Sequence, residues 1–241
     1  MVSSKKETEM KKNFLYSMIL MLATMFVTSC ENDSTEGLTF ITYYPTLTLE
    51  GESFVTSPKG SAFQDPGYSA TLQGEDVTSQ VEVKSNIDTN KSGLYTISYS
   101  ITNEDGFAKT ASRQVLVVDP NDPIENLYTT SADSYRNSGG KITVYGASYK
   151  LYILSNGDGT YTINDMLGGY YDKRAGYGSA YAMVGTFTVA EDGTITALSG
   201  DVAGWGDSMD YLEEGKFDAA TGTISWKLGY AGMDFYVTMN K

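Results

Sequence analysis

The sequence contains no histidine and only one cysteine among its 241 residues. Without histidine, the Ser-His-Asp and Cys-His mechanisms, a histidine general base and an HExxH zinc site are all excluded. A single cysteine can form no disulfide within the chain, so each folded part must be stabilised by its core alone. We therefore expect no catalytic residue, no metal site and no cofactor.

Basic residues are also scarce. The chain has 17 lysines and arginines against 30 aspartates and glutamates, a net charge of −13. That balance disfavours nucleic acid and anionic lipid surfaces as partners, because both repel an acidic protein. It suits a module displayed on a surface, and we expect no nucleic-acid partner.

One long apolar run is present, from 14 to 27, and it closely precedes the single cysteine. Lysines come before the run, which is the layout of a secretory signal over residues 1–29. The run is too short to span a hydrocarbon core of about 30 Å comfortably, which disfavours a retained transmembrane helix. Its ending, Val27-Thr28-Ser29-Cys30, resembles a bacterial lipobox, which implies acylation of Cys30 and cleavage before it. An ordinary buried cysteine is the alternative.

Acidic residues dominate the segment 30–37, which we interpret as a tether. The segment resembles the acidic tract that exports lipoproteins to the cell surface in Bacteroidetes. This resemblance implies a protein of the outer membrane that is attached through its lipid and faces the cell surface. A plain solvated tether is the alternative.

The rest of the chain shows no helical periodicity, and short segments of period two recur between Gly, Asn and Asp turns. This pattern predicts an all-β protein. The predicted domains are 38–119 and 124–241. They are joined by a linker, 120–123, that two prolines stiffen.

Several motifs occur in order in the first domain: Asp65-Pro66-Gly67, Asp76-Val77-Thr78, Gly93-Leu94-Tyr95, Asn103-Glu104-Asp105-Gly106 and a final strand from Arg113 to Val118. This order resembles the immunoglobulin-like domain of bacterial surface proteins, which implies a β-sandwich that serves as a spacer or stalk. Tyr95, two residues after Gly93, could form the tyrosine corner of such a sandwich. The sequence indicates no ligand site in this domain.

In the second domain, alternating strands are separated by hairpin turns at 156–159, 191–193 and 220–222. About eight strands in a meander predict a small antiparallel β-barrel or a strongly curved sandwich. Trp226 alternates with Ile224 and Leu228, which predicts a core position. The turn at 156–159 superficially has the composition of a calcium loop but lacks the downstream ligands, so we interpret it as a hairpin.

The second domain also resembles a C-terminal domain found repeatedly in Bacteroidetes surface lipoproteins. The segments that carry the resemblance are 165–171, 176–181, 204–208, 221–226 and 232–235. The resemblance implies architecture and habitat but no activity. Many such proteins accompany polysaccharide-uptake systems, which makes glycans and uptake-system proteins the partners to consider, by association only.

Two long loops, 165–181 and 201–214, break the alternation and gather aromatic residues next to carboxylates. Flat aromatic faces beside carboxylates are suited to sugars, whose C–H faces stack and whose hydroxyls donate hydrogen bonds. The alternative is that these rings only cap one end of the barrel. The candidate ligand-binding residues are Tyr170, Tyr171, Tyr177, Tyr181, Trp205 and Asp207.

Three functions fit these observations. The favoured one is a non-catalytic surface lipoprotein that presents a ligand-binding domain, most plausibly for a glycan, on an immunoglobulin-like stalk. The second is a structural component of an outer-membrane complex whose loop aromatics contact a protein. The third is a small hydrolase that uses Asp207 with Asp210, or Glu213 with Glu214, as a carboxylate pair.

Overall fold

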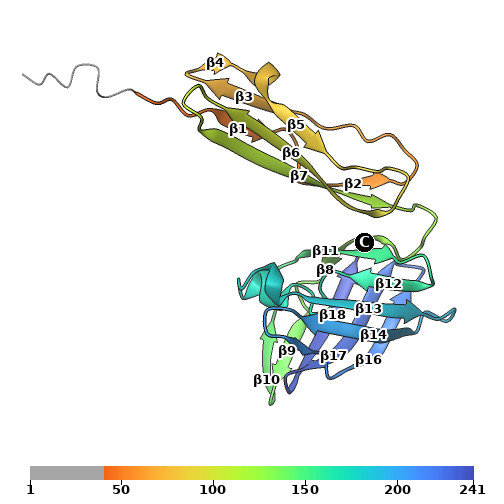
Figure 1. The fold of residues 1–241 in the computed structure, drawn as a ribbon. Coiled ribbons are helices and arrows are strands. Elements are labelled where there is room, and N and C mark those ends of the chain that lie inside the picture. The colour runs from red at the N-terminus through yellow and green to blue at the C-terminus, as the bar shows by residue number, and fades with distance from the viewer. Residues whose placement is uncertain (1–40) are drawn as a thin grey trace, which may run out of the picture. The chain divides into compact units, whose positions relative to one another are not determined.

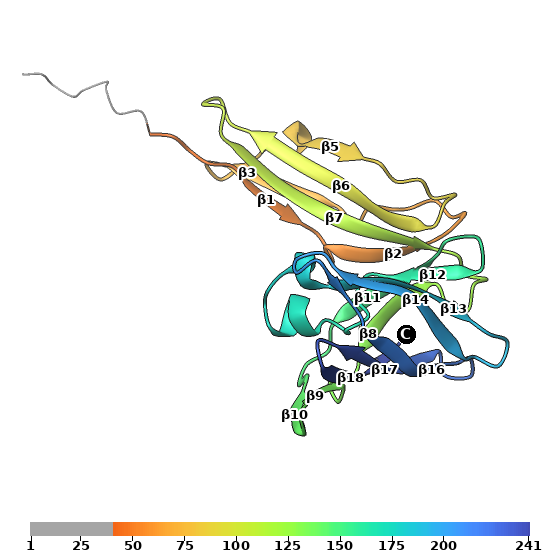
Figure 2. The same ribbon diagram turned by 60° about the horizontal axis from the view of Figure 1, so that its bottom comes forward.

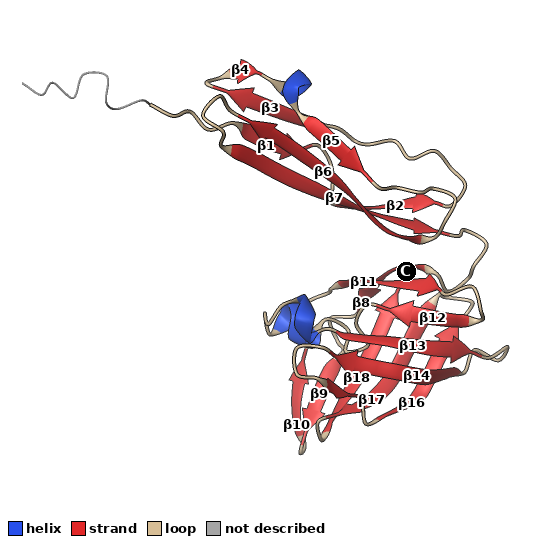
Figure 3. Cartoon of the chain, viewed as in Figure 1, coloured by secondary structure: helices blue, strands red, loops and turns tan. Residues whose placement is uncertain are grey.

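A computed structural model describes residues 41–241, whose regular secondary structure is almost entirely β-strand (Figures 1 and 3). The predicted signal, 1–29, the predicted lipidation site Cys30 and the whole of the tether, 30–37, lie outside the described residues. Within residues 41–241, no helix has the length and apolar character needed to cross a membrane.

The N-terminal strands form two sheets. One has the order β1-β3-β4 and the other β2-β7-β6-β5. All neighbours are antiparallel except β2 and β7, which run parallel. A single 3₁₀ turn, η1 (Thr78–Gln80), interrupts the strands. The strand bounds are β1 (Thr46–Leu49), β2 (Phe54–Pro58), β3 (Tyr68–Leu72), β4 (Glu75–Asp76), β5 (Glu82–Ser85), β6 (Gly93–Thr102) and β7 (Ala108–Val118).

Strand β6 confirms the alternation seen in the sequence. Ile97, Tyr99 and Ile101 are buried and enter the core, whereas Thr96 and Ser98 are exposed. At the start of the strand, the Tyr95 hydroxyl donates to the carbonyl of Lys91 at 2.8 Å. This bond back to the chain a few residues upstream is the one that a tyrosine corner makes.

The Asp65-Pro66-Gly67 turn is held by a buried arginine that the sequence did not single out. Arg113, on β7, is 0% exposed, and its guanidinium pairs with the Asp65 carboxylate. The same guanidinium donates to the carbonyl of Glu50 and to that of Gly67, the last residue of the turn. The Tyr99 hydroxyl also donates to Asp65. The carboxylate therefore compensates a charge that has no access to water.

The C-terminal strands form one sheet of 11 strands, antiparallel at every pairing. Its main path is β10-β9-β18-β8-β11-β12-β13-β14-β15, and β17 pairs with both β16 and β18. The bounds are β8 (Asn126–Thr130), β9 (Tyr135–Ser138), β10 (Lys141–Val144), β11 (Lys150–Ser155), β12 (Thr160–Ile163), β13 (Met183–Val189), β14 (Ile195–Val202), β15 (Asp207–Ser208), β16 (Tyr211–Asp218), β17 (Thr223–Tyr230) and β18 (Met233–Asn240).

This sheet curls strongly, so that β11–β14 face β16–β18 across a core (Figures 1 and 2). Of the two predicted forms, the curved sandwich is the one observed, and the closed barrel is wrong. Only a single bridge, Thr194 to Lys216, joins the start of β14 to β16. The short strand β15 pairs with the other end of β14, and β16 has a register shift between Glu213 and Lys216. Strands β14 and β16 therefore do not pair along their length, and the sheet stays open there.

Trp226 confirms its predicted core position. Its side chain is 3% exposed and packs against Phe187 of β13, with 6.1 Å between ring centroids. Its indole N–H donates to the carbonyl of Met166 at 2.9 Å. This bond satisfies the polar atom of a buried tryptophan and ties the 165–181 loop to β17.

Candidate functional site

The loop 165–181 begins at a carboxylate that is buried on all sides. Asp165 is 1% exposed and accepts backbone N–H groups from Leu167 at 2.9 Å, Gly169 at 3.0 Å and Met183 at 3.1 Å. Burial raises the pKa of Asp165 to about 7, and the three N–H bonds only partly oppose that shift. Asp165 thus fixes the base of the loop to β13.

Two glycines then turn the chain inward. Gly168 and Gly169 have φ of +64° and +85°, and a Cβ on Gly168 would lie 2.8 Å from Val237. After them comes a short π-helical turn, η2 (Tyr170–Arg174), which the sequence did not predict. Tyr170 and Tyr171 are consequently only 4% and 8% exposed. These two candidates lie in the core, and neither offers a ring face to a ligand.

The remaining aromatic candidates come together around Trp205. Its ring centroid lies 4.8 Å from that of Tyr171, 4.8 Å from that of Tyr181 and 5.9 Å from that of Tyr177. Tyr230 of β17 lies beneath, at 6.3 Å. We call these five residues the aromatic cluster. Tyr170 packs below it, against Tyr171 and Phe235.

Two rings of the aromatic cluster remain accessible. Tyr177 is 56% exposed and Trp205 is 44% exposed, and their ring planes are almost perpendicular, at 89°. The Trp205 loop is held close to the first loop, because Gly204 N–H donates to Ala180 at 2.7 Å. A Cβ on Gly204 would lie 2.7 Å from the Tyr181 ring. The two loops therefore present a preformed pair of exposed rings.

The Asp207 carboxylate borders this pair. It accepts a hydrogen bond from the Tyr230 hydroxyl at 2.6 Å, and the Asp207 side chain is otherwise exposed. Burial, followed by this bond to Asp207, raises the pKa of Tyr230, so the phenol stays a donor at physiological pH. Tyr230 was missed from the sequence because it ends an alternating strand and carries no signal of its own.

The acidic residues proposed as a hydrolytic pair have structural partners. Asp210 accepts from Gly232 N–H at 3.4 Å, and Glu213 forms an ion pair with Lys227 at 3.2 Å. Among residues 41–241, no group of three or more Asp, Glu, His or Cys side chains is placed to hold a metal ion. The 156–159 segment forms the predicted β11–β12 hairpin turn, with positive φ at Gly157 and Gly159.

Comparison with known proteins gives two family matches. Residues 47–117 match the Ig-like domain of bacterial surface proteins, and residues 117–241 match a family of C-terminal domains. The crystal structure of the lipoprotein BT2262 from Bacteroides thetaiotaomicron is similar, with a TM-score of 0.75 and 42% identity. The similarity covers 82% of this chain and 100% of BT2262.

Weaker similarities extend to two structures of ZmpB from Clostridium perfringens. The CBM51-2 and INT domains in complex with GlcNAc are 17% identical, with a TM-score of 0.27, over 49% of this chain and 31% of that one. The M60 catalytic domain with its CBM51 domains is 17% identical, with a TM-score of 0.28, over 52% of this chain and 15% of that one. These scores establish no common fold. No protein of curated function matches the chain.

Proposed function

Residues 117–241 make this chain a member of the family of C-terminal domains that they match, and the chain is 42% identical to the lipoprotein BT2262. We therefore propose that it is a cell-surface lipoprotein that binds glycans without catalysis. The lipid is attached at Cys30 and holds the protein in the outer membrane. The Ig-like domain acts as a stalk, and the aromatic cluster is the binding site.

The observation that carries this proposal is the exposed pair Trp205 and Tyr177. Large aromatic side chains usually bury their faces, whereas here two of them stay open while Tyr171 and Tyr181 hold them in place. A rigid ring loses little conformational entropy when it binds a ligand. One ring face can stack on the C–H groups of a pyranose, and the Asp207 carboxylate, beside Tyr230, can accept a hydroxyl.

Replacing the exposed tryptophan tests this proposal. The probe is a neutral polysaccharide that, cast into a native gel, retards the wild-type protein. In Trp205→Ala, we expect the affinity for this polysaccharide to weaken at least tenfold, because the stacking surface is removed. The melting temperature should fall by only a few degrees, since the ring is nearly half exposed.

Tyr211→Ala is the matched control, because this ring is also exposed, at 38%, but makes no contact with the aromatic cluster. Its retardation in the gel should equal that of the wild type. Unchanged retardation of Trp205→Ala would reject the glycan site. The protein-partner alternative would be favoured if the wild type binds no glycan but co-purifies with an outer-membrane protein, and if Trp205→Ala loses that co-purification.

The anchor has a separate test. Cells grown with an alkyne-labelled fatty acid should incorporate label into the wild-type protein and not into Cys30→Ser, because no other thiol exists in the chain. The variant should move from the membrane fraction to the soluble fraction, since several acyl chains are what hold such a protein to the bilayer. Equal labelling of both proteins would disprove acylation at Cys30.

A further inference from the structure

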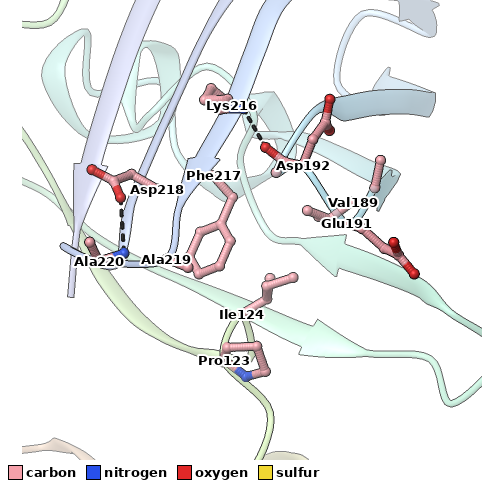
Figure 4. A pocket seen from close by; sticks show the side chains of 12 residues that line it. Pro123, Ile124, Val189, Glu191, Asp192, Lys216, Phe217, Asp218, Ala219 and Ala220 are labelled. Carbon is pink, nitrogen blue, oxygen red and sulfur yellow. Dashed lines mark hydrogen bonds between the residues drawn. The ribbon is translucent and has the colours of Figure 1, made fainter.

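A pocket of about 660 Å³ lies in the C-terminal domain away from the aromatic cluster (Figure 4). The β13–β14 turn, the β16–β17 turn and the residues Pro123 and Ile124 line it. Its apolar lining residues include Pro123, Ile124, Val189 and Phe217. That volume is in the range typical of small-molecule sites.

The walls of this pocket are fixed. The Phe217 N–H donates to the Gly193 carbonyl at 2.8 Å, and Thr194 forms a bridge to Lys216. Gly193 packs so closely on the Phe217 carbonyl that a Cβ would collide with it. The β13–β14 turn therefore rests on β16, and the pocket exists before any ligand arrives.

The lining includes carboxylates. Asp192 accepts the Thr194 N–H at 2.8 Å. Asp218 accepts the Ala220 N–H at 2.9 Å (Figure 4). These backbone bonds lower the pKa of both aspartates, so both are ionised at neutral pH. Glu191 adds a third acidic side chain to the lining. The only basic lining residue, Lys216, already donates its ammonium to the Asp192 carbonyl.

The chain itself places a cation at the border of the pocket. The Lys241 ammonium donates to the carbonyl of Pro123 and lies 5.9 Å from the Phe217 ring centroid and 6.0 Å from that of Tyr128. An aromatic face together with a carbonyl oxygen is a favourable environment for an ammonium group. This end of the domain therefore accommodates an ammonium group of its own chain.

We propose that this pocket binds a small organic amine in which an apolar body is joined to a protonated nitrogen. The apolar body occupies the floor formed by Ile124 and Phe217. The ammonium lies toward the acidic side chains of the lining, Asp192 and Asp218. The site is independent of the glycan site proposed at the aromatic cluster.

The probe pair 2-phenylethylamine and 2-phenylethanol tests this proposal, because the two differ mainly in the charged group. Each is titrated into the ¹⁵N-labelled chain from residue 31 onward, which retains every described residue. We expect the amine to shift the amide signals of Gly193 and Ala220, and the alcohol to bind at least fivefold more weakly. Equal affinities, or no shifts with millimolar amine, would overturn the proposal.

Three variants sharpen the test. Asp192→Asn with Asp218→Asn keeps the oxygens that accept the turn N–H bonds but removes both charges, and should weaken amine binding at least fivefold. Asp158→Asn is the matched control, because Asp158 caps Thr160 in a hairpin turn elsewhere, and should bind like the wild type. Lys241→Met removes the competing cation and should strengthen binding. Equal weakening in Asp158→Asn, or weaker binding in Lys241→Met, would contradict the assigned position.

Discussion

In Asp65→Ala, the Ig-like domain should lose about 3 kcal/mol of stability. The substitution leaves the fully buried Arg113 guanidinium without its counter-charge, and breaking such a pair from one side costs about 3–5 kcal/mol. We take the low end of that range because Asp65 is partly exposed and three backbone carbonyls still accept from Arg113. The turn at 65–67 should also open, because Asp65 no longer links it to Arg113.

Hydrogen exchange measures this effect locally. Both tryptophans lie in the C-terminal domain, so indole fluorescence would not report on the Ig-like domain. Protection of amides in β6 and β7 should fall about 100-fold, which corresponds to about 3 kcal/mol. Glu82→Ala is the control, since its ion pair with Lys84 is exposed and should contribute under about 1 kcal/mol. Equal protection in Asp65→Ala and the wild type would refute the role of the pair.

Removing the Asp165 carboxylate should have a similar effect on the C-terminal domain. In Asp165→Ala, the N–H groups of Leu167, Gly169 and Met183 lose their acceptor in a place that water does not reach. Each unsatisfied buried donor costs about 1–3 kcal/mol, so we expect a loss of about 3 kcal/mol or more. The aromatic cluster rests on this loop, and glycan retention should be lost as well.

The same carboxyl should make stability depend on pH. Its pKa is raised from 3.8 to about 7 on folding, so the folded state binds the proton more tightly than the unfolded state. Its contribution is complete below pH 3.8 and is lost as the pH rises through about 7. Because the chain has no histidine, no other side chain with an ordinary pKa titrates between pH 5 and about 8.

Urea unfolding followed by the fluorescence of Trp205 and Trp226 provides the measurement. The wild type should lose about 2 kcal/mol between pH 5 and 7.5. Asp165→Asn, which cannot ionise, should show a flat profile over that range. Asp158→Ala, in an exposed turn, should follow the wild-type profile. A wild-type profile that is flat or rises with pH would show that the three N–H bonds keep Asp165 ionised.

Much of the fold follows from alternation and turns. The alternating residues of β6, the hairpin at 156–159 and the buried Trp226 are all visible as local patterns in the sequence. Whether the 11-stranded sheet of the C-terminal domain closes into a barrel is not a local property of the sequence. It depends on the register shift in β16 and on how β15 pairs with β14, neither of which leaves a pattern in the sequence.

The site is less predictable than the fold, for the same reason. Composition identified the two aromatic loops, and their rings do meet, yet four tyrosines in one loop look alike in a sequence. The positive φ values at Gly168 and Gly169 and the π-helical turn decide that Tyr170 and Tyr171 point inward while Tyr177 points outward. Asp165 and Arg113 were missed because nothing local distinguishes a buried charge from a solvated one.

The position of β18 has a consequence for how the domain is made. This strand is the last one in the sequence, yet it pairs with β17, β9 and β8, and β8 is the first strand of its sheet. During synthesis, the core therefore lacks a central strand until translation has passed Asn240. Contacts between residues so far apart in the chain form slowly. The domain should accordingly remain unfolded while it emerges from the ribosome, which is the condition in which a chain can be threaded across a membrane.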